Sequence, residues 1–347
     1  MPTLWFILVA GMLGMYVLLD GFDLGAGALH LFVAKTDAER RTVLRAIGPV
    51  WNGNEVWLIA AGGTLFFTFP LLYASSFSGF YLPLIIVLWL LMLRGAAIEL
   101  RSHLHNPVWA SFWDGTFAVA SVLLAIFFGA ALANVVRGVP LDSSRFFFEP
   151  LWTNFDPANV TPGVLDWYTV LIGLLALAAL TVHGANWIAV KTEGPVQERA
   201  RRFARRAWLV TVALTIVCTV ATYGLRPTMF GNFHNAPWGL AFPALVIGGL
   251  VGMGRFGRRK RDRAAFFSSG GFLLGLLASA AFGLYPNVLP AVNPAYSLTI
   301  GNAAAGHYGL VVGLVWWSIG MVLAAVYFIV TYRLFRGKVQ VMAGEGY

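Results

Sequence analysis

Nine apolar runs, each about as long as a membrane-crossing helix, constrain this chain more than any other feature of its sequence. A helix needs about 20 apolar residues to cross the hydrocarbon layer, and a backbone inside lipid must satisfy its own hydrogen bonds. The chain is therefore expected to be an all-α polytopic membrane protein with nine transmembrane helices. The runs lie near residues 3–33, 50–73, 78–100, 111–135, 165–190, 207–225, 238–254, 264–285 and 308–332.

The composition excludes several classes of protein. Charged residues make up 11% of the chain and hydrophobic residues 59%, whereas soluble domains carry about 25% charged residues. A soluble enzyme, a disordered chain and a nucleic-acid-binding module are excluded on this ground. Cys218 is the single cysteine, so an internal disulfide and a cysteine-based zinc or iron–sulfur site are excluded as well.

Basic residues alternate between the two ends of the predicted helices. All but three of the 24 Lys and Arg residues fall in connections on one side, chiefly 34–49, 191–206 and 255–263. Loops rich in Lys and Arg stay in the cytoplasm, so the N-terminus is expected outside and the C-terminus inside. The net charge of +9 then reports orientation and not a nucleic-acid partner.

The connections leave no room for a soluble domain, so residues 1–347 are interpreted as a single integral membrane domain. The longest connection, 136–164, is rich in proline and aromatic residues and is expected to be a flap at the outer interface. The first and fifth runs share a direction, and each leads into a basic connection. The helices are therefore expected to form two four-helix bundles plus one peripheral helix.

Two carboxylates and several glycines interrupt the first run. Asp20 and Asp23 are three residues apart, so they share a helix face. An ionisable residue inside a span is costly and is by default a functional-site hypothesis. Two carboxylates this close repel each other when both are ionised, which suits a proton carrier. Gly21 and Gly25 allow a neighbouring helix to approach closely.

The start of the second run is the other polar segment. Glu55 falls within the first two turns of the predicted helix. Trp51 and Trp57 suit either an interface anchor or a tight helix contact, and Asn52 and Asn54 can hydrogen-bond across helices.

The three span carboxylates, Asp20, Asp23 and Glu55, are expected to converge towards the inner side. Three interpretations remain open for them. They form a proton-uptake path, they are polar contacts that hold helices or a neighbouring subunit together, or they bind a cation.

Other ionisable residues near the ends of runs receive structural interpretations. Arg94 and Arg101, at the end of the third run, are interpreted as charges that extend to the membrane interface. Asp114, at the start of the fourth run, either joins the inner acidic cluster or is a helix N-cap, where negative charge is favoured, and the cap is the preferred interpretation.

Three histidines, His30, His183 and His307, lie in or at the ends of spans and are weak candidates for haem ligands. No two of them are spaced four residues apart. A lone histidine inside a membrane is more often a hydrogen-bonded packing residue, so this chain is expected to bind neither haem nor a metal ion.

Several blocks of sequence are characteristic as a set. They are Asp-Gly-Phe-Asp-Leu-Gly at 20–25, the segment Gly-Pro-Val-Trp-Asn-Gly-Asn-Glu-Val-Trp-Leu at 48–58, Phe-Ser-Gly-Phe-Tyr at 77–81, Glu-Leu-Arg-Ser at 99–102, Trp-Asp at 113–114 and His-Gly-Ala at 183–185. With these blocks and nine spans, the chain resembles subunit II of the cytochrome bd family of quinol oxidases.

The resemblance implies a heterodimer in the bacterial cytoplasmic (inner) membrane that oxidises quinol and reduces O₂ to water in aerobic respiration. It implies that haem b and haem d are held by the larger subunit I, that a small single-span subunit joins the complex, and that a structural quinone and membrane lipids are further ligands. This chain would support subunit I and contribute a cytoplasmic proton path or an oxygen route.

One position departs from the family pattern. Many relatives carry aspartate where this chain has Asn52, and a neutral amide cannot take up and release a proton. Glu55, Asp20 and Asp23 are the remaining carriers for a proton path.

A competing hypothesis from another class is a stand-alone proton-coupled transporter, which the intramembrane acids suggest. Transporters place a polar site near the midplane. The acids here cluster towards the inner face, which favours an oxidase subunit packed against a partner.

Overall fold

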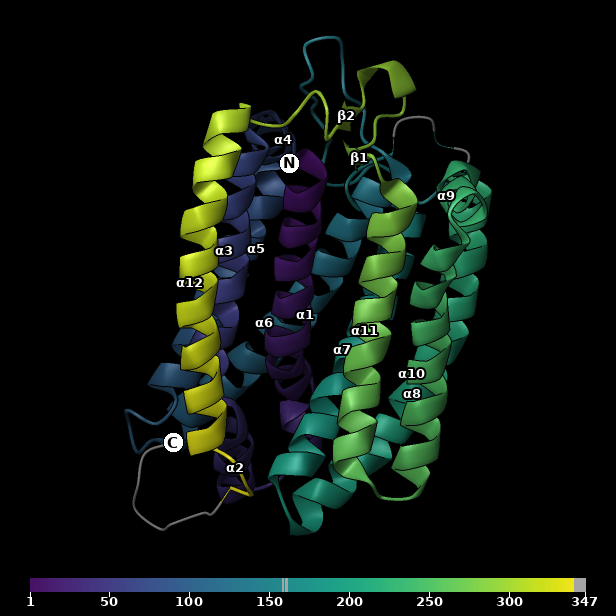
Figure 1. Cartoon of the computed structure of the whole chain (residues 1–347). Coiled ribbons are helices and arrows are strands. Elements are labelled where there is room, and N and C mark those ends of the chain that lie inside the picture. The colour runs from purple at the N-terminus through teal and green to yellow at the C-terminus, as the bar shows by residue number, and fades with distance from the viewer. Residues whose placement is uncertain (158, 160–161, 340–347) are drawn as a thin grey trace.

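A computed structural model, which describes residues 1–157, 159 and 162–339, is a bundle of long helices that run roughly along one axis (Figure 1). Among the described residues, eight helices are long and apolar enough to cross a membrane. They are α1 (Pro2–Val33), α5 (Tyr81–Leu100), α6 (Pro107–Arg137), α7 (Trp167–Lys191), α8 (Gly194–Leu225), α10 (Ala241–Arg258), α11 (Asp262–Leu284) and α12 (His307–Leu334).

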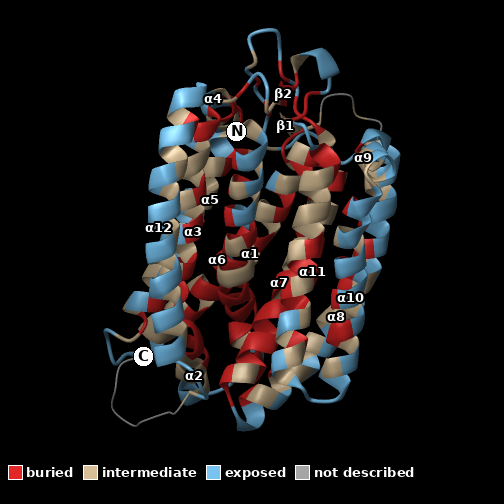
Figure 2. Ribbon diagram, in the orientation of Figure 1, coloured by how far each residue is buried: buried red, intermediate tan, exposed pale blue. Residues whose placement is uncertain are grey.

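The second predicted span is divided into two helices. Its first part is α3 (Trp51–Thr68), which lies beside α12 in both ribbon views (Figures 1 and 2). It has 18 residues, which span about 27 Å. The polar residues of its first turns make it less apolar than the other spans. Because Pro70 has no backbone N–H, α3 ends before it, and α4 (Pro70–Gly79) begins there.

The basic connections are more helical than the hydropathy pattern predicts. The segment 34–49 contains α2 (Asp37–Ile47), whose N-cap Thr36 forms a capping box with Glu39. Helix α8 begins at Gly194 and not near residue 207, so the basic stretch 199–206 is helical. The end of the bundle that carries α2 and the α10–α11 turn, at the bottom of Figure 1, is named the basic end.

The helices group as the sequence predicts. Helices α1, α3, α5 and α6 contact one another, as do α7, α8, α10 and α11, and α1 and α6 meet α7 where the two groups join. Buried residues concentrate along α1, α6 and α7 in Figure 2, whereas α12 is largely exposed. The expected all-α polytopic architecture with a peripheral last helix is confirmed.

The opposite end of the bundle contains a small sheet that the sequence pattern did not predict. Strands β1 (Asn287–Leu289) and β2 (Leu298–Thr299) pair antiparallel. The proline-rich connection rests on this segment, because Val139 forms a bridge with Ala291 and Arg145 donates to the Ser297 carbonyl at 3.0 Å. Shorter helices complete this end: α9 (Gly231–Asn235) and the 3-10 helices Pro227–Phe230, Pro237–Leu240 and Pro294–Tyr296.

Close backbone contact between α1 and α7 joins the two groups of helices. A Cβ atom added at Gly25 would lie 1.9 Å from the Leu180 carbonyl oxygen and 2.8 Å from the Gly184 nitrogen. At Gly21, an added Cβ would lie 2.8 Å from a methyl group of Leu180. Small residues allow helices in lipid to approach this closely and to gain van der Waals contact.

We expect Gly25→Ala to lower the free energy of unfolding by about 1–3 kcal/mol, since the added methyl forces α1 and α7 apart. Gly11→Ala in the same helix is the matched control, because an added Cβ there meets nothing within 4 Å. Thermal unfolding of the two detergent-solubilised variants measures the difference. Equal destabilisation by both substitutions would contradict the proposed packing role of Gly25.

Candidate functional site

A buried ion pair inside the first group of helices is the centre of the candidate site. Arg94 Nη1 of α5 lies 2.8 Å from Asp20 Oδ1 of α1, and both side chains are fully buried. Arg94 Nη2 also lies 3.4 Å from Glu55 Oε2 of α3, whose side chain is 19% exposed. The interpretation of Arg94 as a charge that extends to the interface is therefore wrong. It turns inward because two carboxylates on neighbouring helices provide counter-charges that lipid cannot.

Asp23 belongs to a second polar chain one turn further along α1. Its Oδ2 accepts a hydrogen bond from Asn54 Nδ2 at 2.8 Å, and Asn54 Oδ1 accepts one from the Tyr332 hydroxyl of α12 at 2.9 Å. Asp23 Oδ1 is buried and has no hydrogen-bond partner among the described residues. The structure thus places Asp20, Asp23 and Glu55 in one region, where Arg94 pairs with Asp20 and Glu55 and the Asn54 amide binds Asp23.

Asn52 takes no part in these contacts. Its side chain is exposed on the surface of α3, whereas Asn54, two residues on, is buried between α1 and α12. The amide that hydrogen-bonds an intramembrane acid is therefore Asn54.

The two tryptophans of this segment serve helix packing. Trp51 is buried in the cluster that includes Ala97 and Ile98 of α5, and Trp57 stacks at a tilt on Phe328 of α12 with ring centroids 5.6 Å apart. The sequence left two interpretations open for these tryptophans, an interface anchor and a tight helix contact. The observed contacts are tight helix contacts for Trp51 and for Trp57.

A second buried cluster forms around Asp114 towards the basic end. Asp114 Oδ1 lies 2.6 Å from both His30 Nε2 and Arg101 Nε, and Asp114 Oδ2 lies 2.9 Å from Arg40 Nη1. The N-cap interpretation of Asp114 is wrong, because α6 begins at Pro107 and its cap is Asn106, which accepts from the Val108 amide at 2.8 Å. Arg101, only 2% exposed, is likewise a buried partner and not an interface charge.

The histidines do not offer a haem site among the described residues. His183 Nε2 lies 2.9 Å from the Leu18 carbonyl and Nδ1 lies 2.8 Å from Ser269 Oγ, so both ring nitrogens are hydrogen-bonded. His30 is held by Asp114, and His307 is exposed at the start of α12. No group of three His, Cys, Asp or Glu residues that could hold a metal ion occurs in the described part of the chain.

A third ionic cluster lies at the opposite end. Arg137 pairs with both Glu149 and Asp166, and it donates to Asn134 Oδ1 at 2.7 Å. Glu149 is 4% exposed, and this burial raises the pKa of its carboxyl to about 7, against the opposing effect of Arg137.

The sequence contains a signal for the burial of Arg94, which was interpreted above as an interface charge. Arg94 lies six residues before the end of an apolar helix, deeper than a basic residue that only marks a helix end. A buried arginine needs a counter-charge, and the acids of the first two spans are the nearest candidates. Asn54 and Tyr332 carry no such signal, because only the packing of α3 and α12 brings them to Asp23.

Comparison with known proteins assigns the chain to a family. The family model described as cytochrome bd terminal oxidase subunit II matches residues 1–335. The probable cytochrome oxidase subunit 2 of Haemophilus influenzae is 31% identical, with 96% of this chain and 94% of that protein covered. The cytochrome bd ubiquinol oxidase subunit 2 of Bacillus subtilis is 32% identical, with 88% and 87% covered.

A solved structure has the same fold. A chain of the bd oxidase from Geobacillus thermodenitrificans aligns with a TM-score of 0.74 at 18% identity, over 96% of this chain and 98% of that one. The helical arrangement is therefore shared even where the sequences have diverged.

A double-mutant cycle tests the ion pair. We expect Arg94→Gln to lower the free energy of unfolding by about 3–5 kcal/mol, because it leaves Asp20 buried without its counter-charge. The double variant Asp20→Asn/Arg94→Gln should lose less than the sum of the single variants. Arg258→Gln, at an exposed position, is the control. Additive losses in the cycle would show that Asp20 and Arg94 are not coupled.

The raised pKa of Glu149 predicts a pH dependence of stability. Since the carboxyl binds its proton more tightly in the folded chain, its contribution is present at low pH and is lost as the pH rises through about 7. The thermal midpoint should therefore fall between about pH 5.5 and about pH 8, and Glu149→Gln should reduce this fall.

Asp142→Asn in the same connection is the control for this measurement. Hydrogen bonds from the Ser144 hydroxyl lower the pKa of the Asp142 carboxyl, so it titrates below the tested range. An unchanged pH dependence in Glu149→Gln would exclude Glu149 as its source.

Proposed function

This chain belongs to the cytochrome bd terminal oxidase subunit II family, and from that premise we propose that its intramembrane carboxylates carry protons towards the redox centre of a partner subunit. Subunit II of this family is a component of a quinol oxidase complex in the bacterial inner membrane, a complex that contains haem and a subunit I. The family decides between the two classes of function in favour of the oxidase.

The proposed orientation places the basic end in the cytoplasm and the N-terminus in the periplasm. The one-sided distribution of Lys and Arg supports it. Described residues near both chain ends agree with opposite sides, because α1 starts at the end of the bundle marked N in Figure 1, whereas the Val339 amide donates to the Lys191 carbonyl at the basic end. The C-terminal residue itself lies outside the described residues.

The proposed carriers are Asp20, Asp23 and Glu55. They are carboxyl groups in an otherwise apolar bundle, and they lie closer to the basic end of their helices than to the other. Asn54 and Tyr332 would orient the Asp23 carboxyl, and Arg94 would keep the cluster from carrying its full negative charge. Asn52, exposed and neutral, is left out of the path.

The partial exposure of Glu55 is the observation that carries this proposal. An ionised carboxylate that faces lipid is costly, yet Glu55 is 19% exposed beside the exposed apolar side chains Val56 and Ile59. A partner that covers this face would remove the carboxylate from lipid and receive the proton. We therefore place subunit I against the face of α3 and α5.

We assign the haems, of types b and d, to subunit I. Among the described residues, the histidines of the spans do not fit the group, because both ring nitrogens of His183 are hydrogen-bonded, His30 Nε2 is bound to Asp114, and His307 is exposed. Two cavities of about 570 and 560 Å³ have no histidine in their linings. This chain would therefore serve the redox reaction through protons and packing.

Further partners enter the proposal through the family resemblance. They are quinol and O₂ as substrates, a small single-span subunit, and an oxygen route through this chain. A structural quinone would suit the second cavity, between α3 and α12, whose walls include Trp5, Phe67 and Trp316.

Turnover of the assembled complex tests the carriers. Asp23→Asn and Glu55→Gln should each lower quinol oxidation at least about tenfold without changing the KM for quinol, because an amide cannot relay a proton. Asp23→Glu should retain more activity than Asp23→Asn. Glu198→Gln, an exposed acid on α8, is the matched control.

The haem content of each preparation separates a proton role from a structural one. A variant that assembles with full haem content and unchanged turnover would show that its carboxylate is not a carrier. Loss of haem content would instead assign the carboxylate to assembly.

A further inference from the structure

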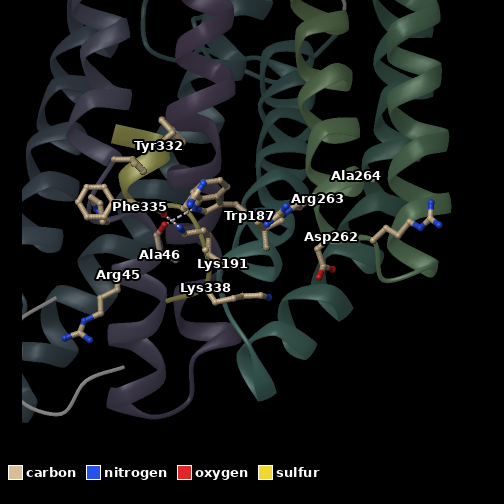
Figure 3. A pocket seen from close by; sticks show the side chains of 16 residues that line it. Arg45, Ala46, Trp187, Lys191, Asp262, Arg263, Ala264, Tyr332, Phe335 and Lys338 are labelled. Carbon is tan, nitrogen blue, oxygen red and sulfur yellow. Dashed lines mark hydrogen bonds between the residues drawn. The ribbon is translucent and has the colours of Figure 1, made fainter. Parts of the chain in front are cut away.

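A cavity of about 570 Å³ opens at the basic end, where four parts of the chain meet (Figure 3). They are the end of α2 with the connection to α3, the last turn of α7, the start of α11 and the end of α12 with the segment that follows it. None of the three proposed carriers lines this cavity, and Tyr332, which contacts Asn54, is the residue that the cavity shares with the proposed path.

The charge of the lining is strongly one-sided. Among the described residues that line the cavity, Asp262 is the single acid, and it is already bound by Arg201, whose Nε and Nη2 lie 2.8 and 2.6 Å from its two oxygens. The basic residues of the lining are Arg45, Lys191, Arg261, Arg263, Arg336 and Lys338. The described lining of the cavity is therefore predominantly basic.

Two lysines build the outer wall. Lys191 Nζ of α7 donates to the Phe335 carbonyl at 2.6 Å, and Lys338 Nζ donates to the Thr192 carbonyl at 2.6 Å. These reciprocal bonds hold the segment after α12 against the end of α7. An ammonium group has three donors, so each lysine keeps at least one for a ligand.

The inner wall is apolar and aromatic. Trp187, Tyr332 and Val50 line it, and the Trp187 indole is fixed because its Nε1 donates to the Ala46 carbonyl at 2.9 Å. The cavity thus combines a wall of hydrocarbon and aromatic rings with a rim of cations.

We propose that this cavity binds the phosphate of an anionic phospholipid headgroup. The basic rim would hold the phosphate, and the apolar wall would contact the glycerol backbone and the first methylenes of the acyl chains. A basic pocket between transmembrane helices at this level is suited to lipid headgroups. Aromatic side chains such as Trp187 and Tyr332 favour the same interfacial depth. A free phosphate ion would use the rim alone and leave the apolar wall without a ligand.

Native mass spectrometry of the delipidated, assembled complex tests the proposal with phosphatidylglycerol as the probe and phosphatidylcholine as the zwitterionic comparison. The complex should retain phosphatidylglycerol in preference to phosphatidylcholine. The double variant Arg263→Gln/Arg336→Gln should weaken this retention at least about tenfold. The control Arg258→Gln/Arg259→Gln removes the same charge at the same end but from residues outside the lining.

Every outcome of this experiment either supports or overturns the proposed lipid site. Weaker retention in the cavity variant, with normal retention in the control and full haem content in both, supports the site. Equal retention of the two lipids, or an equal loss in the control variant, overturns it. Release of the bound lipid by millimolar inorganic phosphate would overturn the proposal that the bound phosphate belongs to a lipid. The cavity would then be a site for free phosphate. Should the double variant not assemble, the preference of the unmodified complex for phosphatidylglycerol over phosphatidylcholine still tests the proposal.

Discussion

The ion pair between Asp20 and Arg94 is the interaction on which the arrangement of the first helices depends. A guanidinium inside an apolar bundle must meet a counter-charge, and here it meets one on α1 and another, Glu55, on α3. The pairing fixes the relative rotation of three helices, because each side chain reaches its partner from only one face. It also decides which acids share a charge environment. Asp20 and Glu55 share Arg94, whereas Asp23 depends on the amide of Asn54.

Helix packing then determines where this polar cluster can act. The contact at Gly25 and Gly184 brings α1 against α7, so the interior side of α1 is sealed by backbone. The polar cluster faces the other way, towards α3, α5 and α12, and among the described residues it is partly exposed at Glu55 and at Tyr332. A carboxylate at the edge of an apolar surface is costly in lipid and useful at a subunit contact. The helix packing and the proposed function therefore both indicate the face of α3 and α5 as the subunit contact.

The fold could be predicted from the sequence because the membrane leaves few alternatives. Long apolar runs and one-sided basic connections predict the observed helices, except that the second run is divided at Pro70 and α8 begins at Gly194 and not near residue 207. The errors of interpretation had one physical cause. Arg94, Arg101 and Asp114 were assigned to interfaces or caps because each lies near the end of an apolar run. A position along one helix does not show which charges neighbouring helices present to it.

The sequence by itself determined the class of structure, the family and the presence of acids inside the spans, since these follow from hydropathy, charge distribution and local sequence blocks. Only the tertiary structure decided how those acids are paired, that Asn54 and not Asn52 is the buried amide, and that a basic cavity forms where α7 and α12 end and α11 begins. The physical reason is one of distance. Electrostatic and hydrogen-bond partners act over a few ångströms in space, and Asp20 and Arg94, or Asn54 and Tyr332, become neighbours only when separate helices pack together.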